Sequence, residues 1–95
     1  MTITVHRNEA THRFEAELDG TPVGFIDYRA RGNEIRLIHT ETLAGFEGRG
    51  VGSALAQFAL DEIRERGEKA VVICPFITSW LTRHPEYVDI TVGTD

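Results

Sequence analysis

The apolar residues of this chain change their spacing partway along it. In the first part they alternate with polar residues, as at Phe14, Ala16 and Leu18, and this is the period of a half-buried strand. From Val51 to Arg66 they recur every three or four residues, which is the period of an amphipathic helix. The change of period predicts strands followed by a helix, each turning one apolar face toward a shared core.

Strands are expected throughout the first part, because residues that favour tight turns interrupt the alternation. Asp19-Gly20 is the clearest interruption, since the pair suits a two-residue hairpin. The expected strands are 3–6, 13–18, 23–28 and 34–42. With such short connections, four strands would form an antiparallel meander.

The second part predicts three further elements after the helix 51–66. The wholly apolar run Ala70–Cys74 is typical of a buried strand. The segment Ile77–Arg83 is expected to be a short helix, because His84-Pro85 disfavours its continuation. The segment Val88–Val92 alternates weakly and is expected to be a final edge strand. The predicted fold class is therefore α+β, a mixed α/β sandwich, formed as a single domain over residues 1–95.

Charge and composition exclude several kinds of partner. The chain has 95 residues, with 10 Lys+Arg against 15 Asp+Glu and a net charge of −5. An acidic balance argues against non-specific nucleic-acid binding, which needs a basic surface. The apolar runs are too short to span a membrane, and the N-terminus lacks the pattern of a signal peptide. We therefore expect a cytoplasmic protein without a nucleic-acid or membrane partner.

Disulfides and metal sites are not expected either. Cys74 is the single cysteine, which excludes an internal disulfide and a multi-cysteine zinc site. His6 and His12 have no neighbouring cysteines or carboxylate pattern that would complete a metal site.

Glycines are concentrated between the last strand of the meander and the long helix, at Gly45, Gly48, Gly50 and Gly52. Glycine lets the backbone approach a ligand closely, and the first helical turn offers unpaired amides and positive potential. Arg49 adds a full charge at the same place. The combination predicts a phosphate-binding loop, the alternative being a connector that only caps the helix. A triphosphatase loop and a dinucleotide-binding unit do not fit, because Gly-Lys-Ser/Thr is missing and the glycines follow antiparallel strands.

The segment Glu47–Gly52 resembles the pyrophosphate loop of the GNAT superfamily of acyl-CoA-dependent N-acyltransferases, usually written Gln/Arg-x-x-Gly-x-Gly/Ala. Gly50 and Gly52 occupy the two glycine positions, and Glu47 stands where the pattern has an amide or guanidinium. Three further motifs occur in the expected order, namely His39–Thr42, Cys74–Phe76 and His84–Tyr87. Over residues 3–92 the chain is similar to the small single-domain GNAT proteins of the YjdJ type.

This resemblance implies transfer of an acetyl group from acetyl-CoA to a small-molecule or peptide amine. It also implies that strand 34–42 and the strand after the helix splay apart, with the pantetheine arm of acetyl-CoA between them. Thr42 and Leu43 would then offer backbone groups to that arm. The pyrophosphate would be held by Gly48, Arg49, Gly50, Val51, Gly52 and Ser53.

The resemblance points to Cys74 and His39 as the catalytic residues at the acyl end. Cys74 is either a small buried hydrophobe or a thiolate that takes the acyl group and passes it on. His39 shares a face with Ile35 and Leu37 in the alternation, so it is either a core histidine or the base for Cys74. Glu41 lies on the same predicted face, as an exposed strand-end acid or as a base for the amine.

Two other functions stay open at this level. A CoA-binding module without catalysis would fit the small size of the chain and the acidic residue Glu47 in the loop. A purely structural α+β domain would use the glycines only to shape a turn. The sequence does not identify the amine or the oligomeric state.

Overall fold

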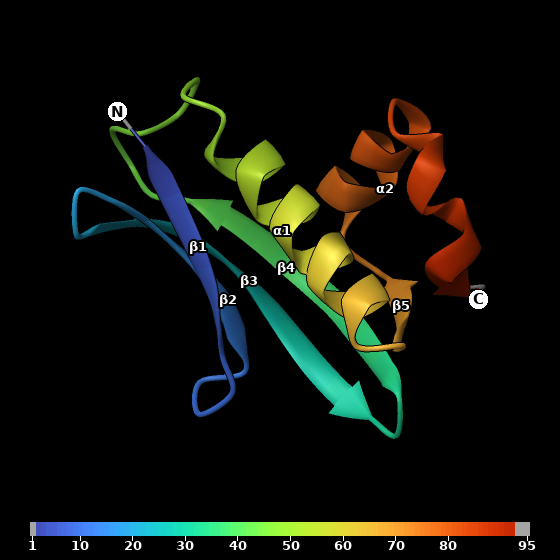
Figure 1. The fold of residues 1–95 in the computed structure, drawn as a ribbon. Coiled ribbons are helices and arrows are strands. Elements are labelled where there is room, and N and C mark those ends of the chain that lie inside the picture. Colours follow the sequence, from blue (N-terminus) through green and yellow to red (C-terminus); the bar gives the residue numbers. More distant parts are fainter. Residues whose placement is uncertain (1, 93–95) are drawn as a thin grey trace.

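The computed structural model describes residues 2–92. It has six strands in one curled sheet, with the helices packed on one side of it (Figure 1). The elements are β1 (Ile3–Asn8), β2 (Arg13–Leu18), β3 (Thr21–Arg31), β4 (Glu34–Thr42), α1 (Val51–Glu65), β5 (Lys69–Val72), α2 (Pro75–Thr82), the 3₁₀ helix η1 (Pro85–Ile90) and β6 (Thr91–Val92). Within these residues, no helix combines the length and apolar character needed to cross a bilayer.

The order of the strands in the sheet is their order in the chain. β1 to β4 pair antiparallel, so the predicted meander is confirmed. β5 pairs parallel with β4 after the crossover through α1, and β6 pairs parallel with β5. The predicted mixed α/β fold, with a loop, helix, strand and short helix after the meander, is confirmed as well.

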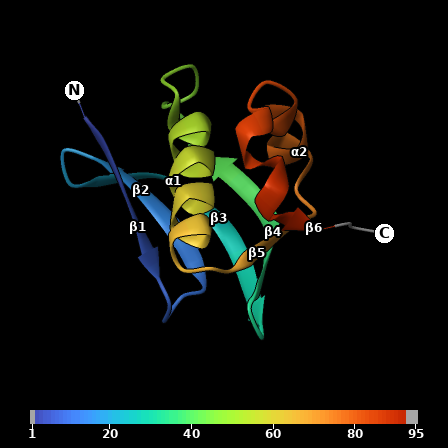
Figure 2. The ribbon, with the colours of Figure 1, turned by 45° about the vertical axis from the view of Figure 1, so that its right-hand side comes forward.

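The core lies between α1 and the sheet face that it covers. Figure 2 shows α1 and α2 on the same side of the sheet. The buried face of α1 meets Phe14 of β2, Tyr28 of β3 and Leu37 of β4, all of which are fully or almost fully buried. The buried residues of α1 are Val51, Leu55, Ala56, Ala59, Leu60 and Ile63. The opposite face of the sheet carries no helix among the described residues and presents polar side chains such as Arg13 and Asp27.

Three predicted segments in the second part have other bounds in the structure, namely the strand 70–74, the helix 77–83 and the edge strand 88–92. The strand expected over Ala70–Cys74 ends at Val72, and the side chain of Ile73 is exposed. α2 begins at Pro75, where the missing amide of proline costs no helical hydrogen bond. The edge strand expected over Val88–Val92 is mostly the helix η1, because one tight turn buries both Tyr87 and Ile90.

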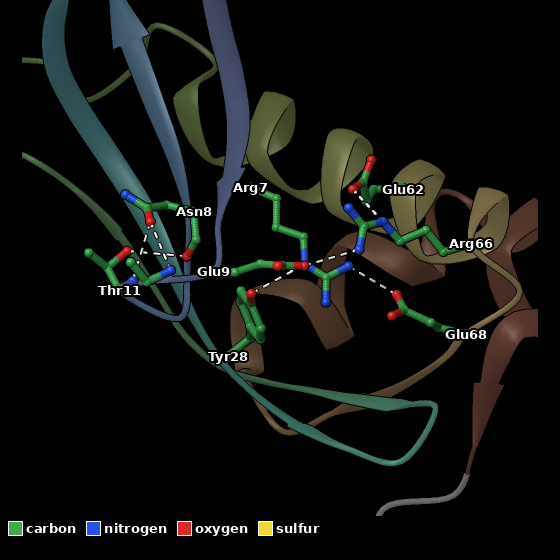
Figure 3. A network of polar contacts seen from close by, with 9 residues as sticks. Arg7, Asn8, Glu9, Thr11, Tyr28, Glu62, Arg66 and Glu68 are labelled. Carbon is green, nitrogen blue, oxygen red and sulfur yellow. Dashed lines mark hydrogen bonds and ion pairs between the residues drawn. The ribbon is translucent and has the colours of Figure 1, made fainter.

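A buried arginine ties the first strand to the rest of the molecule (Figure 3). The side chain of Arg7 is only 6% exposed, and it donates hydrogen bonds to the hydroxyl of Tyr28 at 3.2 Å and to the carboxylate of Glu68 at 3.0 Å. Burial alone would lower the pKa of Arg7, but the hydrogen bonds and the charge attraction of Tyr28 and Glu68 together outweigh it, and the pKa is raised. The guanidinium therefore stays charged while joining β1, β3 and the segment before β5.

Candidate active site

The fourth and fifth strands separate beside the loop that precedes α1. Their parallel pairing ends at Leu37 and Val72, whereas β4 continues to Thr42. The amides of Ile73 and Cys74 both donate to the carbonyl of Leu37, at 2.9 and 3.0 Å. The chain then turns into α2 instead of following β4. The splay that the family resemblance implied is therefore present.

A β-bulge in β4 decides which side chains face the splay. Asp27 pairs with His39 and Tyr28 with Leu37, so the intervening residue Ile38 is extra on β4. Because side chains alternate along a strand, the extra residue reverses the alternation beyond it. Thr40 therefore shares the face of Leu37, and His39 points to the opposite face.

The expectation that His39 lies among apolar residues is wrong for this reason. Its side chain is 56% exposed, and its Nε2 lies 3.2 Å from the Oε1 of Glu41. The ring also contacts that of Phe25 edge-on, with centroids 6.2 Å apart. His39, Glu41 and Phe25 form a group on the helix-free face of the sheet.

The free edge of β4 presents the backbone of alternate residues. The amide of Leu43 donates to the carbonyl of Val23 at 2.9 Å, which places Leu43 in a hydrogen-bonded pair with β3. In an antiparallel ladder the backbone groups of Thr42 and Thr40 then face away from β3 and into the splay. Thr42 thus lies on the free edge of β4. Thr40 was missed, because the free edge exists only through strand pairing.

The expectation for Leu43 is wrong. Its amide is bonded to Val23, and its carbonyl accepts a hydrogen bond from the amide of Phe46 at 3.1 Å. Both of its backbone groups are therefore used within the protein, where they close the turn after β4.

The glycine loop has the backbone shape that its residues predict. Gly48 and Gly50 have φ of 78° and 80°, in the left-handed region that favours glycine. Gly50 is the N-cap residue of α1, and its carbonyl accepts the amide of Ala54 at 3.0 Å. The amides of Val51, Gly52 and Ser53 belong to the first turn, so helical geometry gives them no partner within α1. They are available to a ligand.

Glu47 has a structural task in the same loop. Its carboxylate accepts a hydrogen bond from the amide of Gly45 at 3.0 Å. The side chain that departs from the family pattern therefore holds the loop closed on itself. Glu47 also lines the adjacent cavity and brings a negative charge to it.

A cavity of about 320 Å³ opens where the loop, the end of β4 and α2 meet. It is lined by Thr42, Phe46, Glu47, Gly48, Gly50, Val51, Gly52, Ser53, Phe76, Trp80 and Arg83. Among the described residues, Arg83 is the basic side chain in that lining. Arg49, expected to supply the charge, is outside it, with its guanidinium 5.8 Å from the ring centroid of Phe46. The sequence pattern does not predict the place of Arg83, because α2 is far from the loop in the chain.

Two contacts fix α2 over the first turn of α1. The indole nitrogen of Trp80 donates to the hydroxyl of Ser53 at 2.8 Å, so the side chain of Ser53 anchors α2. A Cβ atom on Gly52 would lie 2.8 Å from the ring of Phe76. Gly52 therefore makes room for Phe76 as well as for any ligand.

Cys74 faces the splay from the end of β5. Its sulfur lies 3.2 Å from the hydroxyl oxygen of Thr40, and the residue is 3% exposed. The bulge turns His39 to the other face of β4, so it is Thr40 that contacts the thiol. The structure thus places Cys74 at the inner end of the splay and His39 with Glu41 on its outer side.

Tyr87 holds η1 against α1. Its hydroxyl donates to the carboxylate of Asp61 at 2.6 Å. Burial, together with this bond to a carboxylate, raises the pKa of Tyr87 to about 12. The phenol therefore stays protonated as a structural donor.

Comparison with known proteins agrees with this geometry. The family model described as GCN5-related N-acetyl-transferase matches residues 13–90. A GCN5-like protein from Staphylococcus aureus is 26% identical in sequence, with a TM-score of 0.70, and the match covers 97% of this chain and 90% of that one. No curated protein sequence matches the chain.

Larger proteins share the fold over part of their length. Ard1 from Thermoplasma volcanium is 28% identical, with a TM-score of 0.58, over 70% of this chain and 47% of that one. The PaiA N-acetyltransferase from Thermoplasma acidophilum, solved in complex with coenzyme A, is 20% identical, with a TM-score of 0.56. That match covers 63% of this chain and 38% of the other, so this chain spans less than half of both larger proteins.

Proposed function

The chain belongs to the GCN5-related N-acetyltransferase family, and on that premise we propose that it transfers an acetyl group from acetyl-CoA to an amine. One observation carries the proposal: the cavity at the N-terminus of α1 adjoins the free edge of β4, and Cys74 lies at the end of the splay. Membership of the YjdJ-type branch is part of the proposal, as is a cytosolic location, where a free thiol stays reduced.

The proposed binding site uses two kinds of protein group. The amides of Val51, Gly52 and Ser53 donate to pyrophosphate oxygens, and the positive end of the α1 dipole favours the anion. Arg83 supplies a full positive charge from the opposite wall of the cavity. The backbone groups of Thr40 and Thr42 pair with the amide groups of the pantetheine arm, as an added strand would.

Cys74 is the proposed acyl acceptor. Its thiolate attacks the thioester carbonyl, a new carbon–sulfur bond forms, and the CoA thiolate leaves and takes up the proton that Cys74 has lost. An amine then attacks the acyl-cysteine and the carbon–sulfur bond breaks, so that the amide forms and the sulfur of Cys74 takes up the electron pair and the proton that the nitrogen loses. Direct attack of the amine on acetyl-CoA is the competing route, and it needs no bond to the protein.

His39 and Glu41 are proposed to act on the amine. A protonated amine has no free electron pair, so it must lose a proton before it attacks. The His39–Glu41 pair lies on the outer side of β4, beside the strand segment that carries Thr40 and the contact with Cys74. An amine that approaches from the helix-free face meets this pair first and can leave its proton there.

Calorimetric binding and a turnover screen test the proposal together. Acetyl-CoA at about 100 times its dissociation constant should stabilise the fold by about 2.7 kcal/mol. Turnover over a panel of amines should then appear as release of free CoA thiol. Binding without turnover would leave the non-catalytic CoA-binding module, and no shift of the melting temperature at millimolar acetyl-CoA would leave a purely structural domain.

A further inference from the structure

A second hollow lies on the face of the sheet that the helices leave open. Its volume is about 270 Å³, and its lining is Arg13, Glu15, Ala16, Glu17, Pro22, Gly24, Phe25 and Leu43. It forms where the pairing of β2 with β3 is interrupted by a register shift beside Ala16 and Glu17. This hollow shares no lining residue with the cavity at the glycine loop.

The hollow adjoins the outer side of the proposed active site. Phe25 pairs in register with Glu41, and its ring contacts that of His39. Leu43 lies directly after the last residue of β4. A molecule seated in the hollow beside Phe25 would therefore lie close to the His39–Glu41 pair and, past the strand edge, to the splay that holds Cys74.

The charges of the hollow select a cation. Arg13 is neutralised by an ion pair with Asp27, with Nε 2.8 Å from Oδ1. Glu15 accepts hydrogen bonds from Asn8 and Thr11, and its Oε1 lies 3.0 Å from the Nε2 of His6, so its charge is already engaged within the protein. The backbone of Glu17 belongs to the sheet, but its carboxylate makes no hydrogen bond or ion pair with residues 2–92, so its charge is available to a ligand. With Glu41 next to it, the hollow carries an uncompensated negative charge.

The apolar part of the lining selects an aliphatic stem. Pro22, Phe25 and Leu43 form its apolar surface, and the Phe25 ring already carries the guanidinium of Arg13 at 3.8 Å from its centroid. Aliphatic stems with a charged head lie along apolar surface with the head in water or beside an opposite charge. The small volume admits one such chain.

From this placement we infer that the hollow binds the acceptor of the proposed reaction, and that the acceptor is a primary alkylammonium on a flexible aliphatic stem. The inference rests on the proposed function, because the bound amine is acetylated only if the protein transfers acetyl groups. Binding of the amine to the hollow is measurable without turnover. A lysine side chain and a small free diamine share this chemistry. The bound ammonium gives its proton to the His39–Glu41 pair, and the free amine then attacks the acyl carbon.

The binding test uses amide NMR spectra of the full chain with cadaverine, with Nα-acetyl-lysine amide and with pentanol. We expect the two ammonium compounds to shift the amides of Glu17, Phe25 and Leu43, and pentanol, which has the stem without the charge, to shift them far less. Stronger binding of the lysine derivative would favour a peptide acceptor, and stronger binding of cadaverine a small diamine. Shifts confined to other surfaces would overturn the inference.

Matched variants complete the test. Glu17→Gln should raise the KM for the alkylamine roughly fivefold with kcat unchanged, the scale of one exposed charge pair. Glu65→Gln, the same change on the exposed side of α1, should leave KM unaltered. Equal effects of the two variants would mean general charge attraction and would overturn the inference. Amide shifts of the hollow residues could also change with protein concentration when no amine is present. That result would mean that a second copy of the chain covers this face, and it would overturn the inference as well.

Failure of the proposed function gives a different result. If acetyl-CoA does not bind, turnover is lost for every variant, but cadaverine still shifts the amides of the hollow. If acetyl-CoA is turned over and no ammonium compound reaches the hollow, the proposed function stands and the assignment of the acceptor site falls.

Discussion

The sulfur of Cys74 lies 3.2 Å from the hydroxyl oxygen of Thr40, across the gap where β4 and β5 have ceased to pair. This contact gives the thiol a defined direction toward the splay. It also separates Cys74 from His39, which the family resemblance groups together, because the residue beside the thiol is Thr40 and the exposed His39 lies on the other face of β4.

Cys74→Ala should bind CoA within a few-fold of the wild-type affinity and lose turnover, because the phosphate contacts lie on α1 and the acyl acceptor is gone. Intact mass after mixing wild-type protein with acetyl-CoA should show one acetyl group on Cys74 that an amine discharges. Thr40→Val, which keeps the shape but removes the hydrogen-bond acceptor, should slow that acetylation. Normal turnover by Cys74→Ala would establish direct transfer instead.

His39→Ala should slow transfer by about 10²-fold or more near neutral pH, because the amine then lacks its proton acceptor. The acetylation of Cys74 by acetyl-CoA should be much less affected, since that step occurs on the other face of β4. His12→Asn is the control, because asparagine tolerates the positive φ of 58° at that residue. A uniform loss of both half-reactions in His39→Ala would contradict the assignment to the amine step.

Arg83→Ala should weaken CoA binding about tenfold, the scale of one charge-assisted hydrogen bond, whereas Arg49→Ala should change it less than twofold. The reason is that Arg83 lines the cavity and Arg49 lies outside it beside Phe46. Titration calorimetry with CoA measures both. Acetyl-pantetheine, which lacks the pyrophosphate, should bind the two variants equally well. A larger loss of CoA affinity in Arg49→Ala than in Arg83→Ala would mean that Arg49 is the residue that binds the pyrophosphate.

Gly24→Ala should destabilise the fold by about 3 kcal/mol, and Gly52→Ala by less. A Cβ on Gly24 would lie 2.6 Å from the carbonyl oxygen of Glu41 and 2.7 Å from Val51, between strand and helix, with no room to move. A Cβ on Gly52 meets only the ring of Phe76, which is 40% exposed and can turn away. Urea unfolding of both variants checks the order, which a larger loss in Gly52→Ala would contradict.

Tyr87 should titrate about two pKa units later than an ordinary tyrosine, because burial and the bond to Asp61 raise its pKa from 10.0 to about 12. A pKa raised on folding stabilises the fold below the unfolded value, so this contribution is complete below pH 10 and is lost as the pH rises toward 12. Absorbance titration of the phenolate should show the late step in the wild type. Tyr87→Phe should lack it and should lose less stability over the same pH interval.

Much of the fold follows from local patterns, and the site depends on relations between elements. Alternation, turn residues and helical period predict the meander and α1, because each is a property of neighbouring residues. The glycines predict the left-handed loop at Gly48 and Gly50 for the same reason. The face of His39 does not follow, because one extra residue at Ile38 reverses an alternation that otherwise continues unchanged along the strand.

The remaining differences have a similar origin. Arg83 enters the cavity only because α2 folds back onto α1 through Trp80 and Ser53. Leu43 loses its expected role because its amide is already bonded to Val23 of β3. The spacing of residues within one segment does not predict these contacts, because each contact joins two segments that are far apart in the chain. Spacing within one segment predicts the kind of element, whereas the partner of each residue is set by the packing of distant elements.

The sheet order has a consequence for how the molecule is made. Because each strand from β2 to β6 pairs with the strand that precedes it in the chain, each of these strands leaves the ribosome with its partner already synthesised. The N-terminal meander can therefore assemble hairpin by hairpin during translation, without waiting for later residues. Cys74 and Arg83 emerge after the meander and α1, so the protein would acquire its chemistry only once those elements have already been synthesised.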